Sequence, residues 1–210
     1  MKFLSYDGLL ARIVRYIWNL FVLNICFILC CLPVITIGAA ISAMYAVFLN
    51  DFRESGVLRK FFGAFAENFK QATVIWLIFM ALAAVLAANW YYLLTYSLGG
   101  NGLLLAVAAV VSVLYLSVVS FAFALQAKYE NSPLLTMKNA LILSIGKFFS
   151  GVLMSFVNLF PVIMFVVDLD VFVNVVAIWI PLGFALQIQI NALIVRRVFR
   201  KLQPQNQKDQ

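Results

Sequence analysis

The chain has 210 residues, of which 65% are hydrophobic and 11% are charged, and its formal net charge is +7. This charged fraction and a mean hydropathy of +1.03 exclude a soluble globular domain, in which roughly a quarter of the residues are charged. The positive charge does not indicate a nucleic-acid partner, because Lys and Arg lie in short segments between apolar runs and not on a basic folded face.

The composition instead predicts an all-α, polytopic transmembrane helical bundle that contacts the lipid bilayer. We expect one transmembrane domain over residues 1–201 and a disordered polar tail over 202–210. Residues 2–15 alternate apolar and charged side chains at helical spacing, which predicts a short helix in the membrane interface.

Residues 16–49 form a long run without a charged side chain. About 20 apolar residues cross a bilayer once, so this run is too long for one upright helix. Pro33 removes a backbone donor and pushes Leu32 away from helical angles, so a break is expected there. We predict two short helices joined at Pro33 to Gly38, which makes Pro33 and Gly38 the candidate hinge. One tilted span is the alternative.

The three cysteines, Cys26, Cys30 and Cys31, all lie in this first apolar run. The chain has no histidine, and no acidic residue lies near these thiols, so a metal site lacks ligands. We interpret the cysteines as small packing residues and expect neither a metal nor another cofactor.

An amphipathic helix is predicted from Leu58 to Lys70, where apolar residues recur at helical spacing and charged residues mostly take the other side. Its aromatic residues Phe61, Phe65 and Phe69 are candidate docking residues for a cytoplasmic partner. Anchoring of the same helix on lipid is the alternative.

Four further apolar segments are predicted spans, at 72–94, 103–125, 148–167 and 172–195. The loops at 97–102 and 168–170 carry no Lys or Arg. Lys and Arg occur instead before Tyr16, between Asp51 and Lys70, between Lys128 and Lys147, and after Val195. The positive-inside rule then gives six membrane segments as three hairpins, with both termini in the cytoplasm of a cell-membrane protein. Five segments with an external N-terminus are the alternative.

Two features of the second half complete this interpretation. Ser132 and Pro133 predict the start of a second cytoplasmic amphipathic helix, with Leu134 and Leu141 on its apolar face. Asp168 and Asp170 are expected in a solvated turn, because buried carboxylates demand partners and none is near in sequence.

The predicted spans contain amides but no group that would relay a proton. Asn24, Asn158 and Asn191 are the candidate residues of a polar path, and hydrogen bonding between helices is their alternative role. Neither a histidine nor a buried carboxylate accompanies the serines of the spans, so we expect no enzyme.

Three ordered motifs carry a resemblance to a known family. They are CLPVITIGAAISAMY at 31–45, FFGAFAENFKQA at 61–72 and YENSPLLTMKNALILSIGKF at 129–148. Together they resemble the YesL family of bacterial membrane proteins, a domain-of-unknown-function family. That resemblance implies a context of carbohydrate uptake, with a carbohydrate ABC importer or a membrane sensor as the candidate partner, and it carries over no functional residue.

Two function classes follow from these observations. The first is a non-catalytic accessory subunit that binds a partner through its cytoplasmic helices and is associated with carbohydrate uptake. The second is a transporter that moves a sugar or oligosaccharide on its own. The sequence leaves the ligand and the oligomeric state open.

Overall fold

The computed structural model describes residues 9–50, 52, 56–96, 102–167, 173–174, 176–177 and 179–202. Its labelled elements are α1 (Leu9–Cys31), η1 (Val34–Thr36), α2 (Ile37–Leu49), α3 (Val57–Tyr96), α4 (Gly102–Gln126), α5 (Pro133–Gly146), α6 (Phe148–Val167), η2 (Trp179–Gly183) and α8 (Phe184–Leu202). No strand occurs in these described ranges, and the all-α class is confirmed. The first residues of the predicted interface helix, most of the loop at 97–102, the acidic turn with Asp168 and Asp170, and the tail after 202 lie outside the described residues.

Four helical stretches are long and apolar enough to cross a membrane: Leu10–Cys31, Val57–Tyr96, Gly102–Gln126 and Trp179–Lys201. A fifth candidate is the pair α5 and α6, which is bent by 105°. The apolar helix Val34–Leu49 is shorter. The structure therefore establishes a helical chain with four or five candidate spans, and it does not establish six.

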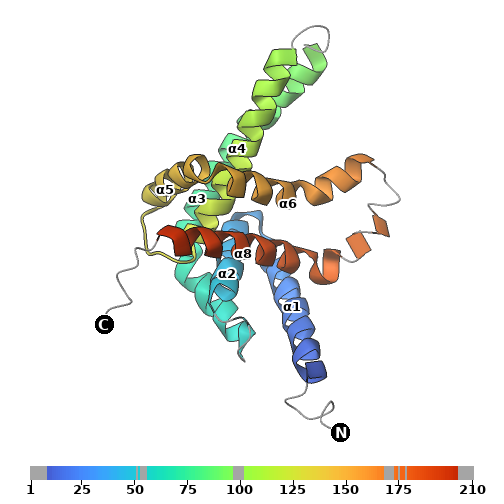
Figure 1. Ribbon diagram of the computed structural model, residues 1–210, viewed down its shortest axis with the longest axis vertical. Helices are drawn as coiled ribbons and strands as arrows, with labels where there is room; N and C mark the ends of the chain where they lie inside the picture. The colour runs from blue at the N-terminus through green and yellow to red at the C-terminus, as the bar shows by residue number, and fades with distance from the viewer. Residues whose placement is uncertain are drawn as a thin grey trace.

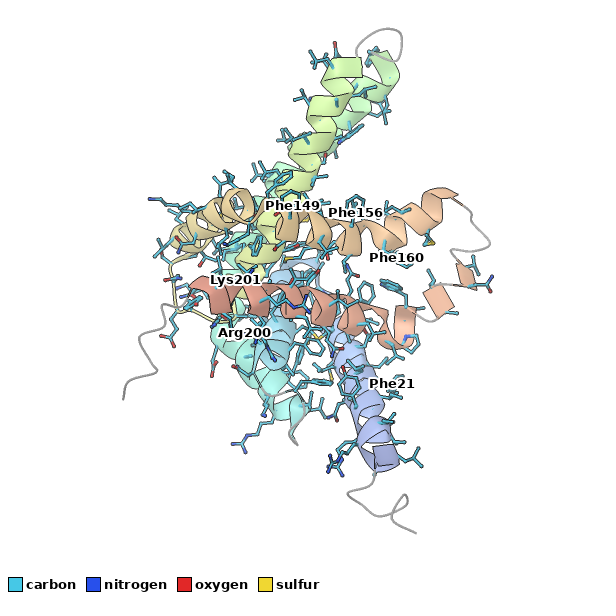
Figure 2. The ribbon with its side chains drawn as sticks, viewed as in Figure 1. Phe21, Phe149, Phe156, Phe160, Arg200 and Lys201 are labelled. Carbon is cyan, nitrogen blue, oxygen red and sulfur yellow. The ribbon has the colours of Figure 1, made fainter. Side chains whose placement is uncertain are left out.

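Helix α2 occupies the centre of the fold and packs most extensively against α3. Figure 1 shows α3 and α4 as a hairpin that extends beyond the other helices, while α6 and α8 run side by side across it. In Figure 2, Phe149 and Phe156 lie along α6. Both rings are exposed, so α6 presents an apolar surface suited to lipid.

The chain breaks between α1 and α2 where the sequence predicts a break. Pro33 has extended backbone angles, with φ −77° and ψ 115°. The Thr36 hydroxyl lies within hydrogen-bonding reach of the Pro33 and Cys30 carbonyls. Trp76 Nε1 on α3 donates to the Val34 carbonyl at 2.8 Å. The Cys30 and Val34 carbonyls at the break thereby gain side-chain donors, while the Pro33 carbonyl also accepts the Thr36 N–H at 3.0 Å.

Gly38, the second candidate hinge residue, comes directly after that break, at the second residue of α2. It lies inside α2, and a Cβ atom there would stand 2.4 Å from the Ala72 carbonyl oxygen and 2.6 Å from Trp76 Cβ. No real Cβ atom tolerates such distances, so the glycine is needed to let α2 and α3 approach closely.

The separate amphipathic helix predicted at 58–70 and the span predicted at 72–94 are one continuous helix, α3. Its 40 residues extend about 60 Å at 1.5 Å per residue, far more than the roughly 30 Å of a bilayer core. The junction at Lys70, Gln71 and Ala72 contains neither Pro nor Gly. Helix propagation therefore continues through the charged segment.

Helix α5 begins at Pro133 as predicted, but the face that it buries is not the predicted apolar face. Its buried residues are Thr136, Ala140 and Ser144, whereas Leu134 and Leu141 of the predicted apolar face are exposed. Small residues allow α5 to approach α3 and α4. Met137 and Leu143 still pack against the core, whereas Leu134, Leu141 and Ile145 face outward.

Candidate functional site

A cavity of about 620 Å³ lies between α1, α2, α4, α6 and α8. Much of its wall is apolar, with Phe27, Ile41, Phe123 and Phe184 among the lining residues. Polar side chains gather on the remaining wall. They are Tyr45, Ser120, Asn158, Gln187 and Asn191. None of the described residues that line this cavity carries a formal charge.

A directed chain of hydrogen bonds connects four of these polar side chains. The Ser120 hydroxyl donates to the Leu116 carbonyl at 2.8 Å. Asn158 Nδ2 donates to Ser120 Oγ at 2.6 Å. Asn158 Oδ1 accepts two further bonds, from Gln187 Nε2 at 3.0 Å and from Asn191 Nδ2 at 2.8 Å. Helices α4, α6 and α8 are thus joined by uncharged groups.

Two acceptors of this cluster have no donor. Gln187 Oε1 and Asn191 Oδ1 are buried and lack a hydrogen-bond partner among the described residues. Leaving a buried acceptor unpaired costs about 1–3 kcal/mol. Both residues line the cavity, but these two oxygen atoms have almost no accessible surface.

Local sequence explains how the cluster is positioned. Gln187 and Asn191 are four residues apart on α8 and therefore share one helix face. Helix α6 can approach α4 because Gly151 has no side chain: a Cβ atom there would lie 1.9 Å from Ser117 Oγ. This close crossing brings Asn158 within reach of Ser120.

The three candidate polar-path residues do not all line the cavity. Asn158 and Asn191 line the cavity, and Asn24 does not. Asn24 is fully buried in α1, where its Nδ2 donates to the Ile180 carbonyl at 2.6 Å and its Oδ1 accepts the Ala185 N–H at 2.8 Å. Asn24 thus bridges the π-helical turn η2 to α8, which is the interhelical hydrogen bonding given above as its alternative role.

The three candidate docking aromatics also differ from one another. Phe61 is fully buried in the core, Phe65 is half-buried and Phe69 is exposed. The Phe61 and Phe65 rings are stacked with their centroids 6.3 Å apart. Phe61 is thus unavailable to a partner, because it faces the chain's own core, whereas the neighbouring Phe62 is 50% exposed.

A second polar cluster, centred on Gln126 at the end of α4, was missed by sequence reasoning. Gln126 Nε2 donates to Gln71 Oε1 at 2.6 Å and to Asn68 Oδ1 at 3.2 Å. The Thr136 hydroxyl donates to Gln126 Oε1 at 3.2 Å. This cluster ties α3, α4 and α5 together. A glutamine that ends an apolar helix was its one sequence signal.

Residues 20–90 match the family described as "Protein of unknown function, DUF624". The matched segment contains the Pro33 break and most of α3, and it ends before Ser120, Asn158 and α8. No curated protein and no solved structure matches the chain. Within the described part, no group of three or more Cys, His, Asp or Glu side chains could hold a metal ion.

Proposed function

We propose that this chain is a membrane protein that binds a small neutral molecule in the cavity between α1, α2, α4, α6 and α8. The observation that carries the proposal is a cavity of about 620 Å³ with an apolar wall and one cluster of uncharged polar groups. Ligand sites typically combine a volume of roughly 300–1,000 Å³, a largely apolar lining and a few placed polar groups.

The proposed role is binding and not catalysis. The chain has no histidine, and the cavity wall offers amides and hydroxyls without a charged acid or base among its described residues. Such groups orient a ligand, but they do not supply a general base or a metal centre.

Photolabelling with a diazirine-bearing octanol tests this proposal in purified protein. We expect saturable labelling of cavity peptides that contain Leu116 to Phe123 or Gln187 to Asn191. The exposed α4 residues Leu103 and Val110 should be labelled without saturation and report partition into lipid. If labelling of the cavity peptides also failed to saturate, the proposed binding function would be wrong.

A partner-binding accessory subunit associated with carbohydrate uptake is the second candidate function. It is supported by the exposed rings of Phe62 and Phe69 on the charged segment of α3. The uptake context derives from the resemblance to the YesL family, with a carbohydrate ABC importer or a membrane sensor as the proposed partner. If the chain itself transports a sugar, the cavity is the proposed site of that solute.

We further propose a location in the cell membrane with six membrane segments and both termini in the cytoplasm. The basic residues near the starts of α1 and α3 and near the ends of α4 and α8 support this arrangement. In it, α2 and α6 are the two segments beyond the four long apolar helices, and α5 is the second cytoplasmic helix.

A further inference from the structure

We infer that a notch at the ends of α2, α4 and α8 binds a phosphate group, which an anionic phospholipid or a soluble phosphate supplies. The notch has a volume of about 120 Å³ and is lined by Leu49, Asn50, Ala127, Lys128, Arg196 and Phe199. None of these residues lines the cavity of the proposed function, so the two sites are separate. The volume suits one polar group, since sites that enclose a drug-sized ligand measure roughly 300–1,000 Å³.

The Arg196 guanidinium is held at this notch by the end of α2. Its Nη2 atom donates to the Phe48, Leu49 and Asn50 carbonyls at 2.6, 3.1 and 3.3 Å. Carbonyl groups at the end of a helix lack partners within that helix, so the arginine caps α2. An arginine side chain has N–H donors on three nitrogen atoms. The N–H groups of Arg196 Nε and Nη1 have no partner among the described residues and are available to a ligand.

The Lys128 ammonium group lies at the same notch. Lys128 is exposed, and its Nζ atom is 4.7 Å from the centroid of the Phe199 ring. Phe199 is buried and follows Arg196 by three residues on α8, so the two residues share one side of the helix. An aromatic ring attracts a cation but does not neutralise it. Two positive charges, from the end of α4 and from α8, thus meet at one small notch.

The charge balance of the notch favours an anionic ligand. No Asp or Glu is among its described lining residues. The C-terminus of α2 carries roughly half a negative charge, which offsets only part of the two positive charges. Arg197, Arg200 and Lys201 add positive charge along the end of α8, where Figure 2 labels the last two. A phosphate group combines negative charge with several acceptor oxygens, which Lys and Arg donors bind strongly.

The location of the notch is consistent with either source of phosphate. The proposed topology places these ends of α2, α4 and α8 on the cytoplasmic side of the membrane. Basic pockets between membrane helices on that side bind the headgroups of anionic lipids. Lys128 is also exposed, so a soluble phosphate can reach it.

Displacement of a fluorescent phosphatidylglycerol from the purified full chain tests the inference. The protein is kept in micelles of an uncharged detergent, and energy transfer from its tryptophans to the probe measures binding. If the source is a lipid, unlabelled phosphatidylglycerol should displace the probe at about tenfold lower concentration than phosphatidylcholine, as one added hydrogen bond between charged groups predicts. Phosphatidylcholine is the control, because its choline group balances the charge of its phosphate.

Sodium phosphate, compared with sodium chloride at the same ionic strength, identifies the source. Stronger displacement by sodium phosphate would show that the soluble group is sufficient, whereas a preference for phosphatidylglycerol alone would assign the site to a lipid. Equal displacement by both lipids together with equal displacement by both salts would overturn the inference.

Lys128→Gln removes one of the two charges, and we expect it to weaken binding of the preferred probe about tenfold. Arg197→Gln is the matched control, because Arg197 is exposed on the same helix end and does not line the notch. Screening by salt should limit its effect to less than about threefold. Equal losses in the two variants, or no loss in the Lys128 variant, would contradict a specific site. Arg196 is kept in both variants, because its removal would also uncap α2.

Discussion

Asn24 Oδ1 accepts the backbone N–H of Ala185 at 2.8 Å, although 161 positions separate the two residues. The same amide donates to the Ile180 carbonyl at 2.6 Å, so one side chain bridges two backbone groups at either end of the turn that contains Pro181. These two backbone groups are five residues apart, which is the spacing of a π-helical hydrogen bond, and the Asn24 amide pairs with both. A side chain on α1 thus completes the hydrogen bonding of the last helix.

Replacing Asn24 by Leu should destabilise the protein. The change keeps the approximate volume but removes the side-chain partner of the Ile180 carbonyl and of the Ala185 N–H, at a cost of about 1–3 kcal/mol. Thermal unfolding in detergent measures the loss. Asn89→Leu is the control, because Asn89 is an exposed amide on α3. Equal unfolding temperatures for both variants would show that the bridge contributes nothing.

Gly38→Ala should also destabilise the protein, by about 1–3 kcal/mol, because overpacking forces the surrounding helices apart. The added methyl group would meet the Ala72 carbonyl at 2.4 Å. Gly63→Ala is the matched control: that glycine also lies in a helix, with no atom within 4 Å of the added Cβ, and the change should stabilise α3 by up to about 1 kcal/mol. Unfolding measurements that rank the two variants in the opposite order would refute the close-approach role of Gly38.

Gln126→Leu should release α5 from α3 and α4. The substitution removes the hydrogen bonds of Gln126 to Gln71, Asn68 and Thr136, and it leaves their polar groups buried or unpaired. Hydrogen exchange should then rise in α5 more than in α2. Thr136→Val, which removes a single bond of the same cluster, should give a smaller rise. Unaltered exchange in α5 would mean that apolar packing alone holds it.

Much of the helical layout could be predicted from the sequence. The predicted span at 148–167 coincides with α6, the span at 103–125 lies within one residue of α4 at each end, and the break falls at Pro33. Hydropathy and proline chemistry are sufficient for such features, because each depends on a short stretch of chain.

The continuity of α3 could not be predicted in the same way. Charged residues such as Lys70 show where a chain leaves the apolar part of a membrane, but they do not stop a helix. The orientation of α5 was missed for a related reason. An apolar face marks the core of a protein in water, whereas lipid accepts such a face, and Thr136 and Ser144 can then turn inward.

Only part of the candidate site could be predicted from the sequence. The spacing of Gln187 and Asn191 places both on one face of a helix. Their hydrogen bonds to Asn158, and through Asn158 to Ser120, join α8 to α6 and α4, which meet only in the folded bundle. Asn24 shows the same limit, since sequence alone does not distinguish an amide that lines a path from one that bridges a helix break.

Six membrane segments with both termini inside make a testable topology. On a background without Cys26, Cys30 and Cys31, a cysteine placed at Asn101 should react with a membrane-impermeant thiol reagent in intact cells. A cysteine placed at Ser5 should react only after the cells are permeabilised, because the basic residues beside it hold the N-terminus inside. External labelling at Ser5 would favour five segments.

The last prediction separates partner binding from autonomous transport. Phe62 and Phe69 are exposed on α3, and aromatic anchors carry a large share of interface energy. If these rings hold a partner, replacing both by Ser should abolish co-purification of that partner from native membranes and leave folding intact.

Phe61→Ser is the contrasting variant, since its ring is fully buried and its loss should destabilise the protein by about 3–5 kcal/mol. If the rings only contact lipid, the double variant should retain every partner. Autonomous transport predicts a different result: purified protein in liposomes should move a sugar without any partner, and Asn191→Leu should slow that flux while Phe62→Ser should not.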